Sequence, residues 1–195
     1  MRREKLARVL AAILGASAAG CALASPNEIR STGPAPAVAK ASPDSLLLLG
    51  TSGGPLARPD RAGIATLLTI GGKTYLIDAG EGVVHQLGKA GMQPAALSTV
   101  FLTHLHDDHY VGLPAVASFA WTLRGPRLDV FGPKGTEDLV KGIWQVMGPN
   151  AQIRMVEQRI ARKPEQFVAA HEYVAGEIFD DGNVHIGRAS CRERV

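Results

Sequence analysis

The chain has 195 residues, of which 46% are hydrophobic and 20% charged, so it can bury the core of one globular domain. Outside residues 1–24 and 186–195 it has 14 basic and 16 acidic residues, and this balance gives no basic footprint for nucleic acid. Cys21 and Cys191 lie in those two end segments, so the rest of the chain has no disulfide, thiolate nucleophile or thiolate metal ligand.

Residues 1–24 have the features of a secretory signal peptide. A basic head is followed by an apolar run over residues 9–19, which is shorter than the about 20 residues that span a bilayer. Residues 22–24 (ALA) form a cleavage site for a signal peptidase, and Cys21 offers lipoprotein processing as the alternative. We therefore expect a periplasmic or secreted protein whose mature form has no transmembrane segment.

The next segments predict a leader and the start of an α/β domain. Residues 25–44 are rich in Ser, Pro and Ala and lack apolar periodicity, which predicts a flexible leader before a domain over residues 45–185. Strands are expected at residues 46–49, 65–70 and 75–77, with a hairpin turn at Gly71 and Gly72. Helical spacing predicts a helix over residues 81–90 that is capped by Gly91, and a further strand follows at residues 99–102.

A strand, a helix and a strand in this order form a crossover unit, so residues 75–77 and 99–102 should lie side by side in a buried sheet. Further along, the pattern predicts a helix at 113–123, a strand at 128–131 and a helix at 136–146.

Two later segments are expected to lie outside this pattern. Residues 148–166 are polar and weakly periodic, and we interpret them as a surface connection, with an irregular excursion near the mouth of the site as the alternative. Residues 186–195 match one reading frame of a common sequencing adapter and are interpreted as a non-native tail, so that the natural protein continues beyond His185.

The most informative motif is THLHDDHY at residues 103–110. Imidazole nitrogens and carboxylate oxygens, without thiolates, are typical of an open catalytic zinc site. At the end of an extended strand, residues two apart project to the same side, so His104 and His106 can bind one ion while Leu105 turns into the core. Asp108 and His109 follow where the chain turns towards a helix, and they can reach a second ion about 3.5 to 4 Å away.

This His-x-His-x-Asp-His motif after a strand resembles the metal-binding motif of the metallo-β-lactamase superfamily. Further pieces are similar to the ribonuclease Z branch, which includes arylsulfatase-like and phosphodiesterase-like members: residues 49–55 (LGTSGGP), Arg61, 76–82 (LIDAGEG), 85–87 (HQL) and 103–106 (THLH). The resemblance extends over about residues 46–185. It implies an α/β fold, the αββα sandwich of this superfamily, of which the chain has the N-terminal half.

The resemblance also implies roles for individual residues. Two Zn²⁺ ions are expected in the full-length protein, the first at His104 and His106 and the second at Asp108 and His109. Asp108 is the candidate catalytic residue, because it can also orient the attacking water. Asp78 is expected to support the site by accepting a hydrogen bond from a metal-bound histidine, with a simple turn aspartate as the alternative.

Some ligands that the superfamily uses are not found in this chain. A further histidine, a bridging aspartate and a final histidine would be needed, and we expect neither His171 nor His185 to be a ligand because their sequence surroundings differ. The chain would then hold at most a partial, weak metal site. The glycine-rich loop at residues 51–54 and Arg61 could bring donors to an anionic substrate, although such a loop is more often a tight turn.

The sequence therefore predicts an exported metal-dependent hydrolase that activates water against a small-molecule phosphodiester, sulfate ester or other ester. Nucleic acid is not the expected partner, because export separates the protein from tRNA and the core is slightly acidic. The alternatives are a ribonuclease Z-type tRNA 3′-end endonuclease, a β-lactam hydrolase, and a non-hydrolytic metal or redox protein of the same fold. A homodimer also remains open, as does an inert chain whose inner sheet face lies uncovered.

Overall fold

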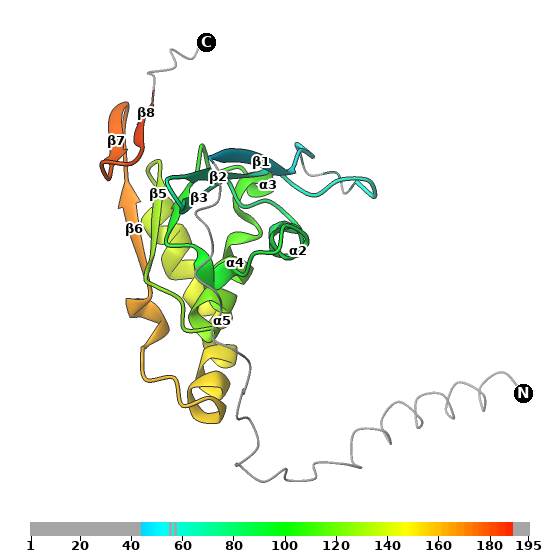
Figure 1. Cartoon of the computed structure of the whole chain (residues 1–195). Coiled ribbons are helices and arrows are strands. Elements are labelled where there is room, and N and C mark those ends of the chain that lie inside the picture. The colour runs from blue at the N-terminus through cyan, green and yellow to red at the C-terminus, as the bar shows by residue number, and fades with distance from the viewer. Residues whose placement is uncertain (1–43, 55, 57, 189–195) are drawn as a thin grey trace, which may run out of the picture. The chain divides into compact units, whose positions relative to one another are not determined.

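A six-stranded mixed sheet is the frame of the fold (Figure 1). The computed structural model describes residues 44–54, 56 and 58–188, so the expected signal peptide and nearly all of the expected leader lie outside the described residues. Neighbouring strands follow the order of the sequence: β1 (Ser45–Gly50), β2 (Ala65–Ile70), β3 (Lys73–Ile77), β4 (Thr99–Phe101), β5 (Leu128–Gly132) and β6 (Val168–Glu172). A separate hairpin joins β7 (Gly176–Asp180) to β8 (His185–Arg188).

The sheet changes from antiparallel to parallel pairing at β3. β1, β2 and β3 pair in antiparallel fashion, and the predicted turn at Gly71 and Gly72 joins β2 to β3 with φ values of 55° and 81°. β3, β4, β5 and β6 then pair in parallel, which confirms the predicted crossover. The connecting helices are α2 (Val83–Lys89), α3 (Asp107–Tyr110), α4 (Leu113–Thr122) and α5 (Thr136–Glu157), with short 3₁₀ turns at Pro94–Ala96 and Pro164–Gln166.

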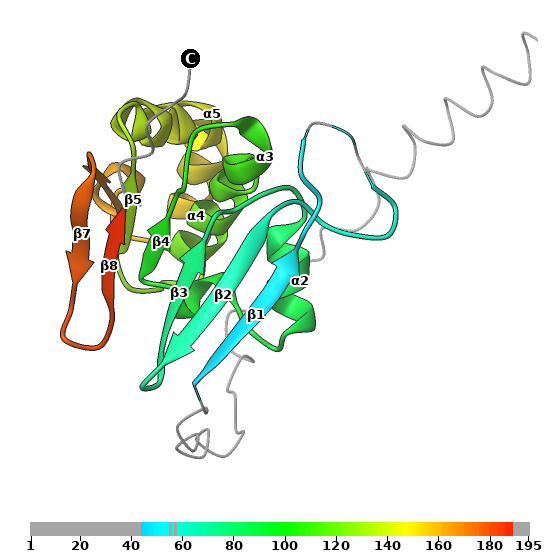
Figure 2. The same cartoon turned by 90° about the horizontal axis from the view of Figure 1, so that it is seen from above.

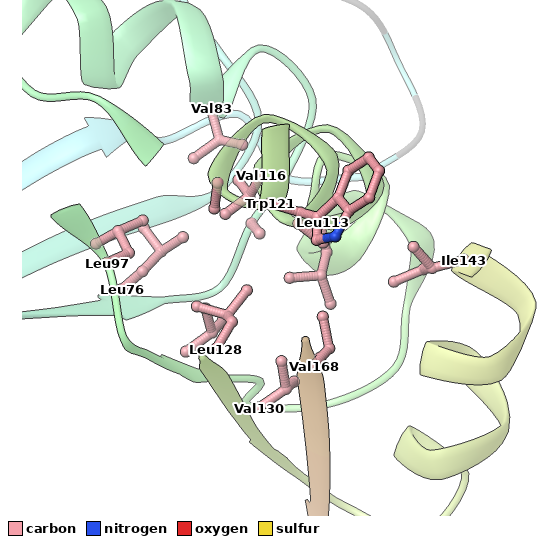
Figure 3. Packing of buried hydrophobic residues seen from close by; sticks show 14 of the residues in the cluster. Leu76, Val83, Leu97, Leu113, Val116, Trp121, Leu128, Val130, Ile143 and Val168 are labelled. Atoms are coloured by element: carbon pink, nitrogen blue, oxygen red, sulfur yellow. The ribbon is translucent and has the colours of Figure 1, made fainter. Parts of the chain in front are cut away.

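The hydrophobic core lies between the sheet and its helices, which Figure 2 shows together on one side of the strands. Leu76, Val100 and Val130 are register partners on β3, β4 and β5, and all three are fully buried. Leu113 of α4 lies over Val130 of β5 and Val168 of β6, and Trp121 packs against Trp144 of α5 with a ring-centroid distance of 6.2 Å (Figure 3). Parallel strands thus hold their carboxyl ends at one edge of the sheet, where β4 leads into the histidines.

The opposite face of the sheet is covered over its centre and open at one side. Phe179 of the hairpin contacts the rings of Tyr75, Phe101 and Phe131, with centroid distances of 6.2, 5.3 and 5.1 Å. Tyr75 and Phe101 are consequently buried, whereas Leu46 and Leu48 on β1 are 62% and 60% exposed. The expectation of an uncovered face is therefore right for β1 and wrong for the aromatic centre.

The prediction for residues 148–166 is wrong over its first half, because α5 continues to Glu157. Pro149 lies inside the helix and leaves the helix one backbone donor short. Tertiary contacts outweigh this local penalty: Ala151 is 3% exposed, and the Asn150 amide donates a hydrogen bond to Ser118 of α4. Within residues 44–54, 56 and 58–188, no helix combines the length and apolar character needed to cross a membrane.

The hairpin is tied to β3 through Asp181, and this contact makes stability depend on pH. Lys73 Nζ and Tyr75 Oη donate to Asp181 Oδ2 at 2.8 and 2.9 Å, and the Lys73 contact in particular holds the pKa of Asp181 far below its ordinary value. Because the unfolded pKa is about 3.9, the stabilisation is complete above that value and is lost as the pH falls towards the folded pKa. Urea unfolding midpoints should therefore fall more steeply between about pH 5 and about pH 2 for the unmodified chain than for Asp181→Asn. Parallel curves for the two chains would contradict this assignment.

Candidate metal site

The four predicted ligands lie on one short segment, residues 103–109, which we call the histidine loop. It begins two residues after β4 ends, and Leu102, which precedes it, is fully buried. Leu105 packs against the core as predicted, so the side chains on either side of it turn away from the core. α3 then starts at Asp107 and carries the rest of the motif. The end of a buried strand therefore fixes where the loop starts.

The structure brings the four predicted ligands together as two pairs of donor atoms. His104 Nε2 lies 3.0 Å from His106 Nδ1, and Asp108 Oδ2 lies 3.7 Å from His109 Nε2. The two pairs adjoin, since the ring centroids of His104 and His109 are 3.9 Å apart. This pairing is the one that the resemblance assigns to the first and the second ion.

Asp78 holds the histidine loop from the end of β3. Its Oδ1 accepts the Thr103 backbone N–H at 2.8 Å, and its Oδ2 lies 2.8 Å from His109 Nδ1. The side chain is 4% exposed, and its backbone is left-handed with φ 59°. Ala79 N–H donates to His109 O at 2.7 Å, so the backbone after Asp78 also binds the loop. Asp78 therefore contacts both the backbone and a side chain of the histidine loop.

The same network assigns the tautomers of two histidines. A carboxylate only accepts hydrogen bonds, so His109 carries a proton on Nδ1 and the Thr103 hydroxyl, 2.9 Å from Asp78 Oδ2, donates to Asp78. Thr103 Oγ1 can then accept from His104 Nδ1, which lies 3.1 Å away. In the neutral form of each ring this arrangement leaves Nε2 without a proton, and imidazole binds a metal in that form.

The local electrostatics favour the same protonation states. Burial lowers the pKa of His104, and the neighbouring His109 and His106 lower it further. The Gly54 N–H donates to Asp108 Oδ2 at 2.6 Å and holds the pKa of that carboxyl below its ordinary value. A neutral imidazole and an ionised carboxylate are the forms that metal binding requires.

The donor set fits zinc in kind, because it combines imidazole nitrogen with carboxylate oxygen. Among the residues that the structure describes, no three or more His, Cys, Asp or Glu side chains are placed to hold one ion together. Each pair thus supplies two donors, whereas zinc sites usually take three or four protein ligands.

His171 and His185 lie away from the histidine loop. His171 Nε2 is 2.8 Å from Asp129 Oδ1, and its ring stacks on Phe131. His185 Nδ1 lies 3.4 Å from Asp180 Oδ2. Both rings therefore have carboxylate partners on the strands and the hairpin.

Two contacts of the site were not predicted from the sequence. Thr103 was part of the motif but had no assigned role, although a hydroxyl directly before His104 was a visible signal. Gly54 belongs to the glycine-rich loop, which was expected to act on a substrate or as a turn. Its N–H instead donates to Asp108 of the chain itself.

At Gly80 the backbone passes close to the backbone of Asp108, in the histidine loop, and to that of Ile64. A Cβ atom at this position would lie 2.5 Å from the Asp108 carbonyl oxygen and 2.6 Å from Ile64 N. Gly80→Ala should therefore destabilise the fold by about 1–3 kcal/mol, measured by urea unfolding. Gly88→Ala is the matched control: nothing lies within 4 Å of its Cβ, and alanine in α2 should stabilise by about 0.5–1 kcal/mol. Equal effects at the two glycines would contradict the crowding at Gly80.

Comparison with known proteins places these features in context. The family described as Anti-Pycsar protein Apyc1 matches residues 45–178. The chain is 36% identical over 153 residues to ribonuclease Z of Mycobacterium marinum, covering 76% of this chain and 54% of that protein. It thus spans about half the length of the curated relatives it matches.

Solved structures give the same picture. Human tRNase Z, short form, is 29% identical with a TM-score of 0.51, over 65% of this chain and 43% of that one. The metallo-β-lactamase fold protein YhfI from Bacillus subtilis, at 19% identity, shares the fold with a TM-score of 0.50 over 70% of this chain and 48% of that one. The chain has an α/β metallo-β-lactamase-like fold that covers about half of each of these structures.

Proposed function

The chain belongs to the family described as Anti-Pycsar protein Apyc1 and is related to ribonuclease Z, and we propose that the whole protein is a metal-dependent hydrolase of small anionic esters. The single observation that carries the proposal is the adjacent placement of the two donor pairs at the carboxyl end of β4. Sites in α/β sheets usually form at that edge.

His104 and His106 would hold one zinc ion, and Asp108 and His109 the other. The ions would supply the acidity that makes water nucleophilic near neutral pH, and positive charge beside the oxygen that becomes negative. Asp78 and Thr103 keep the two Nε2 atoms free of protons, and Asp108 can accept a proton from the attacking water and orient it. The remaining ligands would come from the part of the whole protein that its relatives have beyond this chain.

A small phosphodiester or sulfate ester is the preferred substrate class. A cavity of about 220 Å³ adjoins Asp108, and its charged lining consists of Arg58 and Arg61 together with Glu81 and Asp107. Arg61 pairs with Asp60 at 2.7 Å, whereas Arg58 has no partner among the residues the structure describes. A guanidinium group binds phosphate and sulfate oxygens well, and a volume below 300 Å³ suits a small substrate.

We also propose that residues 1–24 direct export to the periplasm or the medium. Amino-terminal sequencing of the protein purified from each compartment tests this, since export by this route requires a new terminus at Ser25, or at a modified Cys21. An intact Met1 in the mature cellular protein would rule it out.

The catalytic proposal is tested on the uninterrupted reading frame that contains residues 45–185. Zinc content is measured by elemental analysis, and turnover is measured with bis(p-nitrophenyl) phosphate, p-nitrophenyl sulfate, precursor tRNA and nitrocefin. Bound zinc with hydrolysis of the small esters supports the proposal. Cleavage of tRNA alone would assign the ribonuclease alternative, nitrocefin turnover alone the lactamase alternative, and bound iron without turnover the redox alternative.

A further inference from the structure

The peptide group that joins Leu102 to Thr103 directly precedes His104, and its two polar atoms are held from opposite directions. Its N–H, on Thr103, donates to Asp78 Oδ1 at 2.8 Å. Its carbonyl oxygen, on Leu102, accepts a hydrogen bond from the Tyr173 hydroxyl at 2.5 Å. Tyr173 lies just beyond β6, 71 residues further along the chain.

The hydrogen-bond pattern between β4 and β5 explains why Leu102 O takes its donor from Tyr173. Leu102 N–H donates to Phe131 O at 2.8 Å, which continues the parallel ladder between β4 and β5. In such a ladder the next bond would run from the N–H of residue 133 to Leu102 O. Residue 133 is proline and has no N–H, so the ladder cannot supply that donor. A buried carbonyl without a donor is unfavourable, and Tyr173, just beyond β6 on the far side of β5, provides the donor.

Several hydrogen bonds fix the backbone at the end of β6. Tyr173 N–H donates to Gly132 O at 2.9 Å, and Glu172 Oε1 accepts from Gly135 N and Glu137 N at 2.7 and 3.1 Å. These contacts tie the residue before Tyr173 to the start of α5. The Tyr173 hydroxyl therefore binds Leu102, directly before the histidine loop, from a backbone that is itself held by hydrogen bonds.

We propose that Tyr173 is a positioning residue for the metal site: together with Asp78 it fixes the Leu102–Thr103 peptide plane, and this plane sets the direction of His104 and the Thr103 hydroxyl. The part of the inference that concerns zinc rests on the proposed function. The part that concerns the peptide plane does not, because it is a property of the protein without metal.

The test uses Tyr173→Phe in the full chain, with Tyr75→Phe as the matched control. Tyr75 also has a hydrogen-bonded hydroxyl, but its partners are Asp181 and Asn183 of the hairpin. Without metal, amide hydrogen exchange at Thr103 should accelerate at least about tenfold in Tyr173→Phe and stay unchanged in Tyr75→Phe. With metal, zinc affinity measured against a chelator should fall about 10- to 100-fold in Tyr173→Phe only, the range typical of groups that orient metal ligands. The visible spectrum of bound Co²⁺ should change as well.

Thermal unfolding of both variants separates a local effect from general destabilisation. Unchanged Thr103 exchange in Tyr173→Phe, or equal acceleration in both variants, overturns the inference. If the protein expressed from the uninterrupted reading frame binds no zinc, the proposed function fails, while the Thr103 measurement still decides the role of Tyr173.

A second variant tests the reason for the contact. Adding Pro133→Ala to Tyr173→Phe restores an N–H at the position where the ladder lacks one. Recovery of Thr103 protection supports the explanation. Protection that stays as low as in the single variant shows that the missing donor is not the cause and overturns it.

Discussion

Replacing His104 and His106 together with alanine should abolish zinc binding at the first donor pair and lower ester turnover by more than about a hundredfold. Groups that merely orient metal ligands already account for 10- to 100-fold effects, so loss of two ligands must exceed that range. Metal content and the initial rate with bis(p-nitrophenyl) phosphate, both on the uninterrupted reading frame, measure the result.

The control for this experiment is His171→Ala. His171 is 41% exposed and pairs with Asp129, so its loss removes an imidazole without touching the histidine loop. It should leave zinc content and rate unchanged. Turnover that survives the double replacement at the level of the control would remove the basis for a metal-dependent mechanism.

Asp78→Asn is expected to weaken zinc binding about 10- to 100-fold while preserving the fold. Asparagine keeps an oxygen for Thr103 N–H and tolerates the left-handed backbone at φ 59°. Its amide, however, places donor hydrogens where Asp78 Oδ2 accepts from His109 Nδ1. His109 must then carry its proton on Nε2, the atom that faces the Asp108 carboxylate, and that atom can no longer bind a metal.

Two further variants serve as a control and as a more severe change at the same position. Asp129→Asn changes an aspartate that makes a comparable 2.8 Å contact with His171, and it should not alter zinc affinity. Asp78→Ala leaves the Thr103 N–H without an acceptor and should cost about 1–3 kcal/mol of stability in addition to the loss of affinity. Equal zinc affinity in Asp78→Asn and the unmodified chain would show that the tautomer of His109 is not set by Asp78.

Much of the fold was predictable because periodicity and turn residues agree with the final packing. Alternating and continuous apolar runs located the strands from β1 to β5, and Gly71 with Gly72 marked the first hairpin. The helix predicted at residues 136–146 was shorter than α5, because Pro149 and the polar residues after it are locally unfavourable for a helix. The contacts that outweigh them, such as Asn150 to Ser118, join segments that no local pattern connects.

The candidate site also has a part that the sequence predicts and a part that only the folded chain shows. His104, His106, Asp108 and His109 lie within six residues, so their spacing alone predicted two donor pairs. The groups that contact the segment around them come from elsewhere: Asp78 follows β3, Gly54 lies in a loop before β2, and Tyr173 follows β6. Of these three, Asp78 was predicted, by resemblance. The contacts of Gly54 and Tyr173 depend on strand order and on the missing N–H of Pro133.

The 71-residue separation between Leu102 and Tyr173 has a consequence for the order of events during synthesis. A polypeptide leaves the ribosome from its amino end, and Asp78 is available to bind Thr103 as soon as the two segments emerge. The hydroxyl that completes the attachment arrives only after all of α5 and β6 have been made. The contact between Tyr173 and Leu102 therefore forms only after His104 and His106 have been made and β6 has docked beside β5.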